Sequence, residues 1–170
     1  MTEKKILDIG CGEHCLPGAV GMDIRPFPGV VAHDLCKGPY PFEDNSFKHI
    51  RCQHVIEHIQ NLPLFAKEVF RICAPNATIE FKTPHYSSYA SWGDPTHFWH
   101  FALGSIPQLF DQNIGKENYT LIQNKIKFTG SFFDIPGRII YKLSPKRYEK
   151  YFAWRYPANE IVTILRFKKD

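Results

Sequence analysis

The stretch Ile6-Leu7-Asp8-Ile9-Gly10-Cys11-Gly12 decides the fold of this chain. A short apolar run over residues 5–9 predicts a buried parallel strand, and two glycines follow it. Glycines at a strand end let the backbone turn sharply and approach a ligand closely. In open α/β sheets, ligands bind in the crevice outside the carboxyl ends of the strands. We therefore expect a binding crevice beside Gly10 and Gly12.

Two further acidic residues follow predicted strands. Gly21-Met22-Asp23-Ile24-Arg25 is a second short strand with a carboxylate placed to accept hydrogen bonds from the two hydroxyls of a ribose, and Asp34 follows a third strand over residues 30–32. A nicotinamide-binding fingerprint would need a third glycine where Cys15 stands, and an acidic residue about 20 residues after the glycines. Asp23 comes much sooner, so this alternative is disfavoured.

These landmarks resemble the class I S-adenosylmethionine-dependent methyltransferases, and more closely their small type 11 branch. The resemblance continues through residues 33–35, 41–47, 53–58 and 70–72 to a strand over 78–83, roughly the first half of the chain. It implies an α/β, Rossmann-like fold with a mostly parallel sheet and an antiparallel edge hairpin. It also implies S-adenosylmethionine as the cofactor. The implied cofactor residues are Asp8, Gly10 and Gly12 at the methionine pocket, Asp23 at the ribose with Ile24 beside it, Asp34 and Leu35 at the adenine, and His54 at the mouth of the site.

The chain is predicted to be one methyltransferase domain over residues 1–170. Residues 1–83 would form the cofactor-binding half and 84–170 the acceptor-side half, with a basic aromatic insertion at 131–157. Only Glu13 to Val20 separate the first two strands, whereas a parallel crossover normally takes a dozen residues or more. We therefore expect a shortened first crossover without its usual helix, and the amides of residues 12–14 or a basic side chain in its place at the cofactor carboxylate.

The remaining elements follow from caps and periodicity. Residues 48–52 predict the fourth strand, and Asn61 with Pro63 predicts a helix start. Pro75 is expected to stop that helix before a fifth strand at 78–82, and 84–104 form a long loop. A helix at 106–113 is expected to begin with Ser105 as its cap. Strands are expected at 121–129 and 160–168, and the family resemblance implies that they pair antiparallel at one sheet edge. The apolar stripe of the first helix is Leu62, Phe65, Ala66, Val69 and Cys73.

Composition is that of an ordinary soluble globular protein, with 44% hydrophobic and 22% charged residues. The five cysteines form no Cys-x-x-Cys pair, so buried reduced thiols are expected. Residues 1–5 lead directly into a strand and leave no room for a signal peptide. No apolar run approaches the ~20 residues of a membrane helix. We expect a cytoplasmic protein with no membrane span.

Basic residues concentrate between Arg138 and Tyr156, where six of them face one acid, Glu149. The local charge of +5 compares with +4 for the whole chain. A helix starting at Ser144-Pro145 would carry Tyr148, Tyr151, Phe152 and Arg155 on one face. The segment either binds an anionic partner such as RNA, a nucleotide sugar or phospholipid headgroups, or is an amphipathic cover whose aromatics pack on the sheet edge. The cover is favoured, because charge runs usually face solvent.

The residues after the fourth strand bear on the methyl acceptor. By resemblance, base and glutamine amine methylation would require Asn/Asp-Pro-Pro-aromatic there, and cytosine carbon methylation a Pro-Cys pair; this chain has Gln53-His54-Val55-Ile56 and no Pro-Cys. An oxygen, a carbon or a non-base nitrogen of an unidentified acceptor remains. The alternatives are a non-catalytic S-adenosylmethionine-binding subunit, and an RNA methyltransferase that uses the basic segment.

Histidines supply the candidate chemistry. His54-Val55-Ile56-Glu57-His58 matches the inverted zinc-protease motif, but it leaves a strand and a helix cap follows at once, so zinc proteolysis is disfavoured. His85, Asp94 and His97 are the candidates for acceptor binding or proton removal, since histidine titrates near neutrality. Alternatively, His97 and His100 only order their loop, or His85, Asp94 and His97 bind a divalent metal. We expect no metal, because their spacing is not diagnostic.

Overall fold

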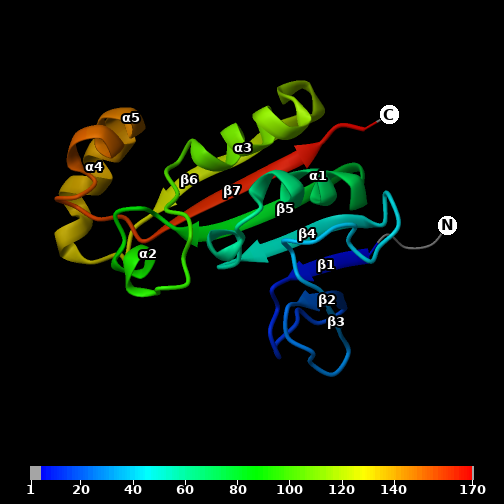
Figure 1. Ribbon diagram of the computed structural model, residues 1–170. Coiled ribbons are helices and arrows are strands. Elements are labelled where there is room, and N and C mark those ends of the chain that lie inside the picture. Colours follow the sequence, from blue (N-terminus) through cyan, green and yellow to red (C-terminus); the bar gives the residue numbers. More distant parts are fainter. Residues whose placement is uncertain (1–4, 170) are drawn as a thin grey trace.

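The computed structural model describes residues 5–169, which form a seven-stranded sheet flanked by helices (Figure 1). The strand order is β3-β2-β1-β4-β5-β7-β6. The bounds are β1 Lys5–Ile9, β2 Ala19–Asp23, β3 Val30–Ala32, β4 Phe47–Gln53, β5 Cys73–Pro84, β6 Tyr119–Lys127 and β7 Glu160–Phe167. The residues from which we excluded a signal peptide lie, except for Lys5, outside the described part.

Strands β1 to β5 run parallel, and β7 pairs antiparallel with both β5 and β6. The expected antiparallel hairpin at the sheet edge is therefore confirmed. Ile9 lies beside Met22 on one side and Cys52 on the other, so β1 sits inside the sheet. The carboxyl ends of β1, β2 and β4 consequently meet at one edge.

The first crossover has no helix. The chain passes from Ile9 to Ala19 through turns alone, as the short spacing predicted. Between β4 and the first long helix stands one short 3-10 turn, η1 (Ile56–His58).

Helix α1 (Leu62–Ile72) starts as expected, because the Asn61 side chain accepts a hydrogen bond from the Leu64 amide. It packs against α3 (Ser105–Ile114). Two details were wrong. The stripe ends at Ile72 rather than Cys73, and Pro75 lies inside β5, which begins at Cys73. The pairing of β5 with β4 shifts register between Cys73 and Thr78, so an irregular start accommodates the proline.

The acceptor-side half departs further from expectation. The expected loop 84–104 contains a short helix, α2 (Tyr89–Gly93), capped by Ser88. Ser105 does not cap α3: Gly104 holds the cap position, and Ser105 Oγ instead accepts from the Ala102 amide.

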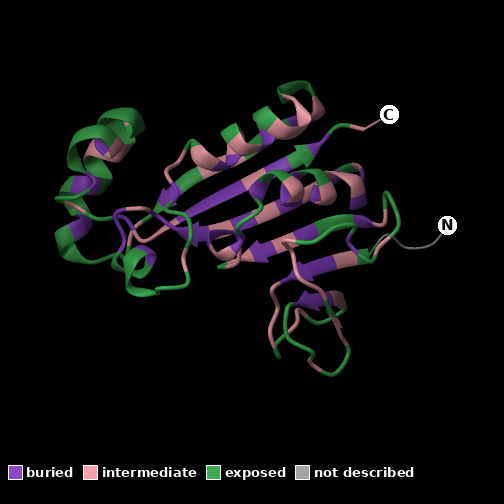
Figure 2. Cartoon of the chain, viewed as in Figure 1, coloured by how far each residue is buried: buried purple, intermediate pink, exposed green. Residues whose placement is uncertain are grey.

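The basic aromatic insertion forms a helical projection beyond the sheet, shown mostly exposed in Figure 2. It comprises η3 (Phe132–Asp134), α4 (Ile135–Leu143), α5 (Pro145–Arg147) and the π-helical η4 (Tyr148–Phe152). Only Tyr148 of the expected aromatic face is buried, whereas Tyr151 is 64% exposed. The prediction that these aromatics pack together on the sheet edge is therefore wrong.

The main core lies between the sheet and its helices, with Leu7, Phe65 and Phe81 fully buried (Figure 2). The cysteines of the described residues are free thiols, but only Cys52 and Cys73 are buried, fewer than expected. Within residues 5–169, no helix is both long and apolar enough to cross a membrane.

Candidate active site

The turn after β1 depends on Gly10. Its φ of +66° is left-handed, and a Cβ there would overlap the Val55 side chain that follows β4. Its amide donates to the Met22 carbonyl at 2.7 Å. Because glycine alone satisfies both conditions at little cost, the β1 end can close against β2 and β4. Gly10 then lines a cleft outside the strand ends.

Asp8 shapes this turn from below. Its side chain is buried and lies outside the cleft lining. One carboxylate oxygen accepts from the Leu16 amide at 2.9 Å, and the other from Arg51 Nε at 2.8 Å. Asp8 therefore ties the connection after β1 to β4 and positions the loop.

Gly12 and Asp23 are joined directly. The Gly12 amide donates to Asp23 Oδ2 at 2.9 Å, while Oδ1 accepts from the Arg25 amide at 3.0 Å. Each carboxylate oxygen can accept more than one hydrogen bond, so both keep acceptor capacity toward the cleft. Ile24 follows with 68% of its surface exposed and gives the same cleft an apolar face.

The cleft has a volume of about 920 Å³, a size typical of small-molecule sites. Most of the residues predicted to bind the cofactor line this cleft, whereas Asp8 and Gly12 do not. Those in the lining are Gly10, Asp23, Ile24, Asp34, Leu35 and His54. Residues from four separate strand ends therefore meet at one hollow.

Asp34 is held in its ionised form. Its Oδ1 accepts from the Cys36 amide at 2.9 Å, and Oδ2 lies 3.4 Å from Lys37 Nζ. The Cys36 hydrogen bond, with Lys37 beside it, lowers the pKa of Asp34. Two carboxylates, one beside an apolar side chain, supply hydrogen-bond acceptors that fit the hydroxyls of a ribose and the amino group of a base.

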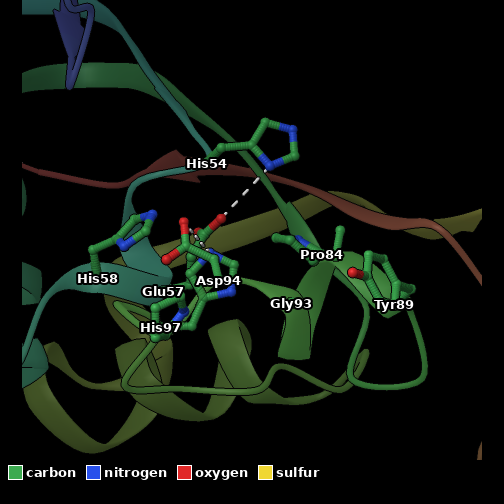
Figure 3. Close-up of a pocket in the computed structure, with 10 residues that line it drawn as sticks. His54, Glu57, His58, Pro84, Tyr89, Gly93, Asp94 and His97 are labelled. Carbon is green, nitrogen blue, oxygen red and sulfur yellow. Dashed lines mark ion pairs between the residues drawn. The ribbon is translucent and has the colours of Figure 1, made fainter.

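A second cavity, of about 620 Å³, adjoins this cleft. Residues that line the second cavity are drawn in Figure 3. Both the cleft and the second cavity are lined by His54, His58 and Pro95. The second cavity also takes Glu57 from η1 and Tyr89 from α2. Of the candidates for acceptor chemistry, Asp94 and His97 line it and His85 does not.

The Asp94 and His97 pair is ordered by its own loop. Asp94 Oδ1 accepts from the Thr96 amide at 2.8 Å and from the Thr96 hydroxyl at 2.6 Å. These hydrogen bonds lower the pKa of Asp94. His97 Nδ1 lies 3.0 Å from the Ser91 carbonyl, and its Nε2 lies 3.9 Å from Asp94 Oδ2.

His85 is separated from that pair. Its ring is fully buried, with Nδ1 2.8 Å from Ser87 Oγ and Nε2 3.3 Å from Glu149 Oε1. It also packs against Tyr86 and Tyr148. His85 thus joins the end of β5 to the helical projection. The fold does not bring His85 together with Asp94 and His97, contrary to the predicted group of three.

His54 stands where the cleft and the second cavity meet. Its φ of +55° is left-handed, and its amide donates to the Lys82 carbonyl at 2.8 Å. Its ring lies between two carboxylates, 3.5 Å from Glu57 Oε1 and 3.1 Å from Glu160 Oε1. Interaction with Glu57, and then with Glu160, raises the pKa of His54.

Comparison with known proteins identifies the family. A family model described as a methyltransferase domain matches residues 2–116, more than half of the chain. The chain belongs to this methyltransferase family. No curated protein sequence matches this methyltransferase.

Solved structures confirm the fold of this methyltransferase. A SAM-dependent methyltransferase from Archaeoglobus fulgidus superposes with a TM-score of 0.65 at 17% identity, covering 96% of this chain and 86% of that one. A putative methyltransferase from Bacillus halodurans superposes with a TM-score of 0.68 at 13% identity, covering 97% of this chain and 93% of that one. A Haemonchus contortus phosphoethanolamine N-methyltransferase was solved with phosphomonomethylethanolamine and S-adenosylhomocysteine. It superposes with a TM-score of 0.60 at 14% identity, covering 99% of this chain and 49% of that one. The expected class I fold is confirmed, and S-adenosylmethionine is the cofactor of the class.

Glu57 and His58 of this methyltransferase were not predicted as site residues. The sequence signal was present, because both belong to the stretch that matches the inverted zinc-protease motif. The geometry of that motif is absent: η1 covers only Ile56–His58, and His54 precedes it with a left-handed backbone. His54 and His58 therefore do not share one face of a helix.

Proposed function

We propose that this methyltransferase moves the methyl group of S-adenosylmethionine to an oxygen, a carbon or a non-base nitrogen of an acceptor in the second cavity. One observation carries the proposal. The nucleoside-sized cleft at the strand ends and the cavity lined by Asp94 and His97 share the residues between them. A donor and an acceptor held in the two spaces would therefore meet at His54, His58 and Pro95.

Each cofactor contact follows from the placement of a side chain. Asp23 would accept hydrogen bonds from the ribose hydroxyls, with Ile24 against the base. Asp34 and the Leu35 amide would hold the adenine edge, and the loop shaped by Asp8, Gly10 and Gly12 would enclose the methionine part. The bound donor supplies an already activated methyl group, so the protein has only to align the acceptor and exclude water.

One proton must leave a hydroxyl or amine acceptor. His97 is suited to accept it, because its Nδ1 faces the Ser91 carbonyl, which can only accept a hydrogen bond, and Nε2 then keeps a lone pair. Asp94 fixes the loop that presents this ring. We leave His85 out of the acceptor site and assign it to the joint between β5 and the projection. Residues 1–83 would thus supply the cofactor side and 84–170 most of the acceptor side.

Calorimetry with S-adenosylhomocysteine, followed by transfer of labelled methyl groups to components of a cell extract, tests this function. Saturable binding with one site per chain and labelled product are expected. Binding without turnover would favour the non-catalytic subunit, and no binding would contradict both.

The basic projection supports a second candidate, methylation of RNA. All six basic side chains between Arg138 and Arg155 are exposed, as are the aromatics Tyr151 and Trp154. Such a surface can bind phosphates and stack bases. RNA retention that weakens steeply with salt would support this acceptor, and no retention at low salt would remove it.

A further inference from the structure

Glu57 is a buried carboxylate that lies at ion-pair distance from His54 but accepts no hydrogen bond within the described residues. Its side chain is 1% exposed, and neither carboxylate oxygen has a hydrogen-bond partner among the described residues. The Nδ1 atom of His54 lies 3.5 Å from Oε1. Burying a carboxylate without hydrogen-bond donors is unfavourable, so native proteins pair such groups or use them as metal ligands. Glu57 also lines the second cavity.

Two histidines converge on Glu57. One ring nitrogen of His58, one of His97 and a carboxylate oxygen of Glu57 all lie within 4.8 Å of one another, and all three residues line the second cavity (Figure 3). The two imidazole rings meet edge to face, with centroids 4.6 Å apart.

The hydrogen bonds of both rings fix which nitrogen is free. His58 Nδ1 lies 3.2 Å from the Thr96 carbonyl, and His97 Nδ1 lies 3.0 Å from the Ser91 carbonyl. Since a carbonyl only accepts, Nδ1 carries the hydrogen and a neutral ring keeps its lone pair on Nε2. The Thr96 hydroxyl donates to Asp94, so it too can only accept from His58. Metal-binding histidines are held in this way by their second nitrogen.

The backbone also fixes the loop that carries His97 against η1. The amides of Phe98 and Trp99 donate to the Glu57 carbonyl at 2.9 and 3.3 Å, and Trp99 Nε1 donates to the Ile59 carbonyl at 2.7 Å. Ligands far apart in the sequence are therefore held together by contacts that do not involve their own side chains.

We propose that Glu57, His58 and His97 bind one divalent transition-metal ion. Two imidazoles and one carboxylate suit Fe(II), Mn(II), Co(II) or Zn(II), and three protein ligands leave coordination positions open toward the cavity. An acceptor oxygen in an open position would be oriented beside the cleft. With the ion bound, the Nε2 lone pair of His97 is used in coordination, so the ion would ease loss of the acceptor proton by lowering the acceptor pKa, and His97 would accept that proton only in the metal-free protein. That role rests on the proposed function, whereas the ion site itself does not.

Cobalt titration of the full chain, after removal of metals with a chelator, tests the site by the visible spectrum of bound Co(II). One ion per chain with micromolar or tighter affinity is expected, with displacement by Zn(II). Glu57→Gln and His97→Asn should each weaken binding at least about tenfold. His49→Asn, which removes an imidazole from β4, should change nothing.

A second variant covers the possibility that those substitutions unfold the protein. His97→Cys supplies a thiolate at the same position, so its Co(II) form should gain a sulfur-to-metal charge-transfer band. Absence of that band, wild-type affinity only in the millimolar range, or equal losses in His49→Asn and His97→Asn would overturn the proposal. Calorimetry with S-adenosylhomocysteine on the same samples reports separately on the proposed function.

Discussion

Gly10 and Val55 touch where β1 and β4 end, so closely that no Cβ fits at Gly10. Gly10→Ala should destabilise the fold by about 1–3 kcal/mol through this overlap, in addition to about 1–2 kcal/mol for a left-handed backbone. Urea unfolding measures the loss. Gly18→Ala is the matched control, because Gly18 has a φ of +79° and open space around it. Equal losses at the two positions would contradict a role for Val55, and adding Val55→Ala should recover part of the loss in Gly10→Ala.

Asp23 should dominate affinity for the nucleoside. Hydrogen bonds to a charged group contribute about 1.5–3 kcal/mol, so Asp23→Ala should weaken S-adenosylhomocysteine binding by about 10- to 150-fold. Asp23→Asn keeps one acceptor oxygen and should lose less. Calorimetry provides both values. Asp44→Asn, at an exposed carboxylate paired with Arg71, is expected to bind as wild type does. Unchanged affinity in Asp23→Ala would refute the placement of the ribose.

Asp94 should affect turnover more than donor binding. Its carboxylate holds Thr96, and Thr96 in turn contacts His58, so Asp94→Ala should loosen the acceptor side of the site. Small misplacements cost up to about 100-fold in rate, and we expect methyl transfer into extract to fall about 10- to 100-fold. Affinity for S-adenosylhomocysteine should fall by less than the rate, because of these residues only Thr96 and His58 also line the cofactor cleft. A parallel loss of both would place Asp94 in the cofactor cleft instead.

Glu68 should make stability depend on acid. Arg71 donates to it at 2.7 and 3.0 Å and lowers its pKa in the folded state from the ordinary 4.5. Because the folded pKa is the lower one, this stabilisation is complete above the ordinary pKa and is lost as pH falls through the folded value. Glu68→Gln should therefore lose more stability at about pH 7 than at about pH 3.5 in urea unfolding. Glu43→Gln, at an exposed side chain, should show no such difference.

Sequence patterns predicted the sheet well because strands β1 to β3 are short, largely apolar and bounded by turn residues. The α1 start was equally legible, since Asn61 caps it locally. The errors arose where distant contacts decide the structure. Pro75 is tolerated in β5 through a register shift, and Ser105 forms a different hydrogen bond from that of a cap. His85 contacts Glu149 of the projection, which lies 64 positions later in the sequence. No local sequence pattern indicates such a contact.

The cofactor side of the candidate site was predictable from the order of the strands. Asp23 and Asp34 follow their strands directly, so their convergence follows from sheet order alone. The meeting of His97 with Glu57 and His58 depends on backbone contacts between two loops, and these have no sequence periodicity.

The residues shared by the cofactor cleft and the second cavity limit how this methyltransferase can be redesigned. Exchanging His54, His58 or Pro95 would alter donor and acceptor recognition together, so selection for a new acceptor would be penalised by a poorer donor fit. Tyr89 and Ala90 of α2 line the second cavity but not the cofactor cleft. A library restricted to that short helix is accordingly the place from which a change in substrate preference would come without loss of the methyl supply.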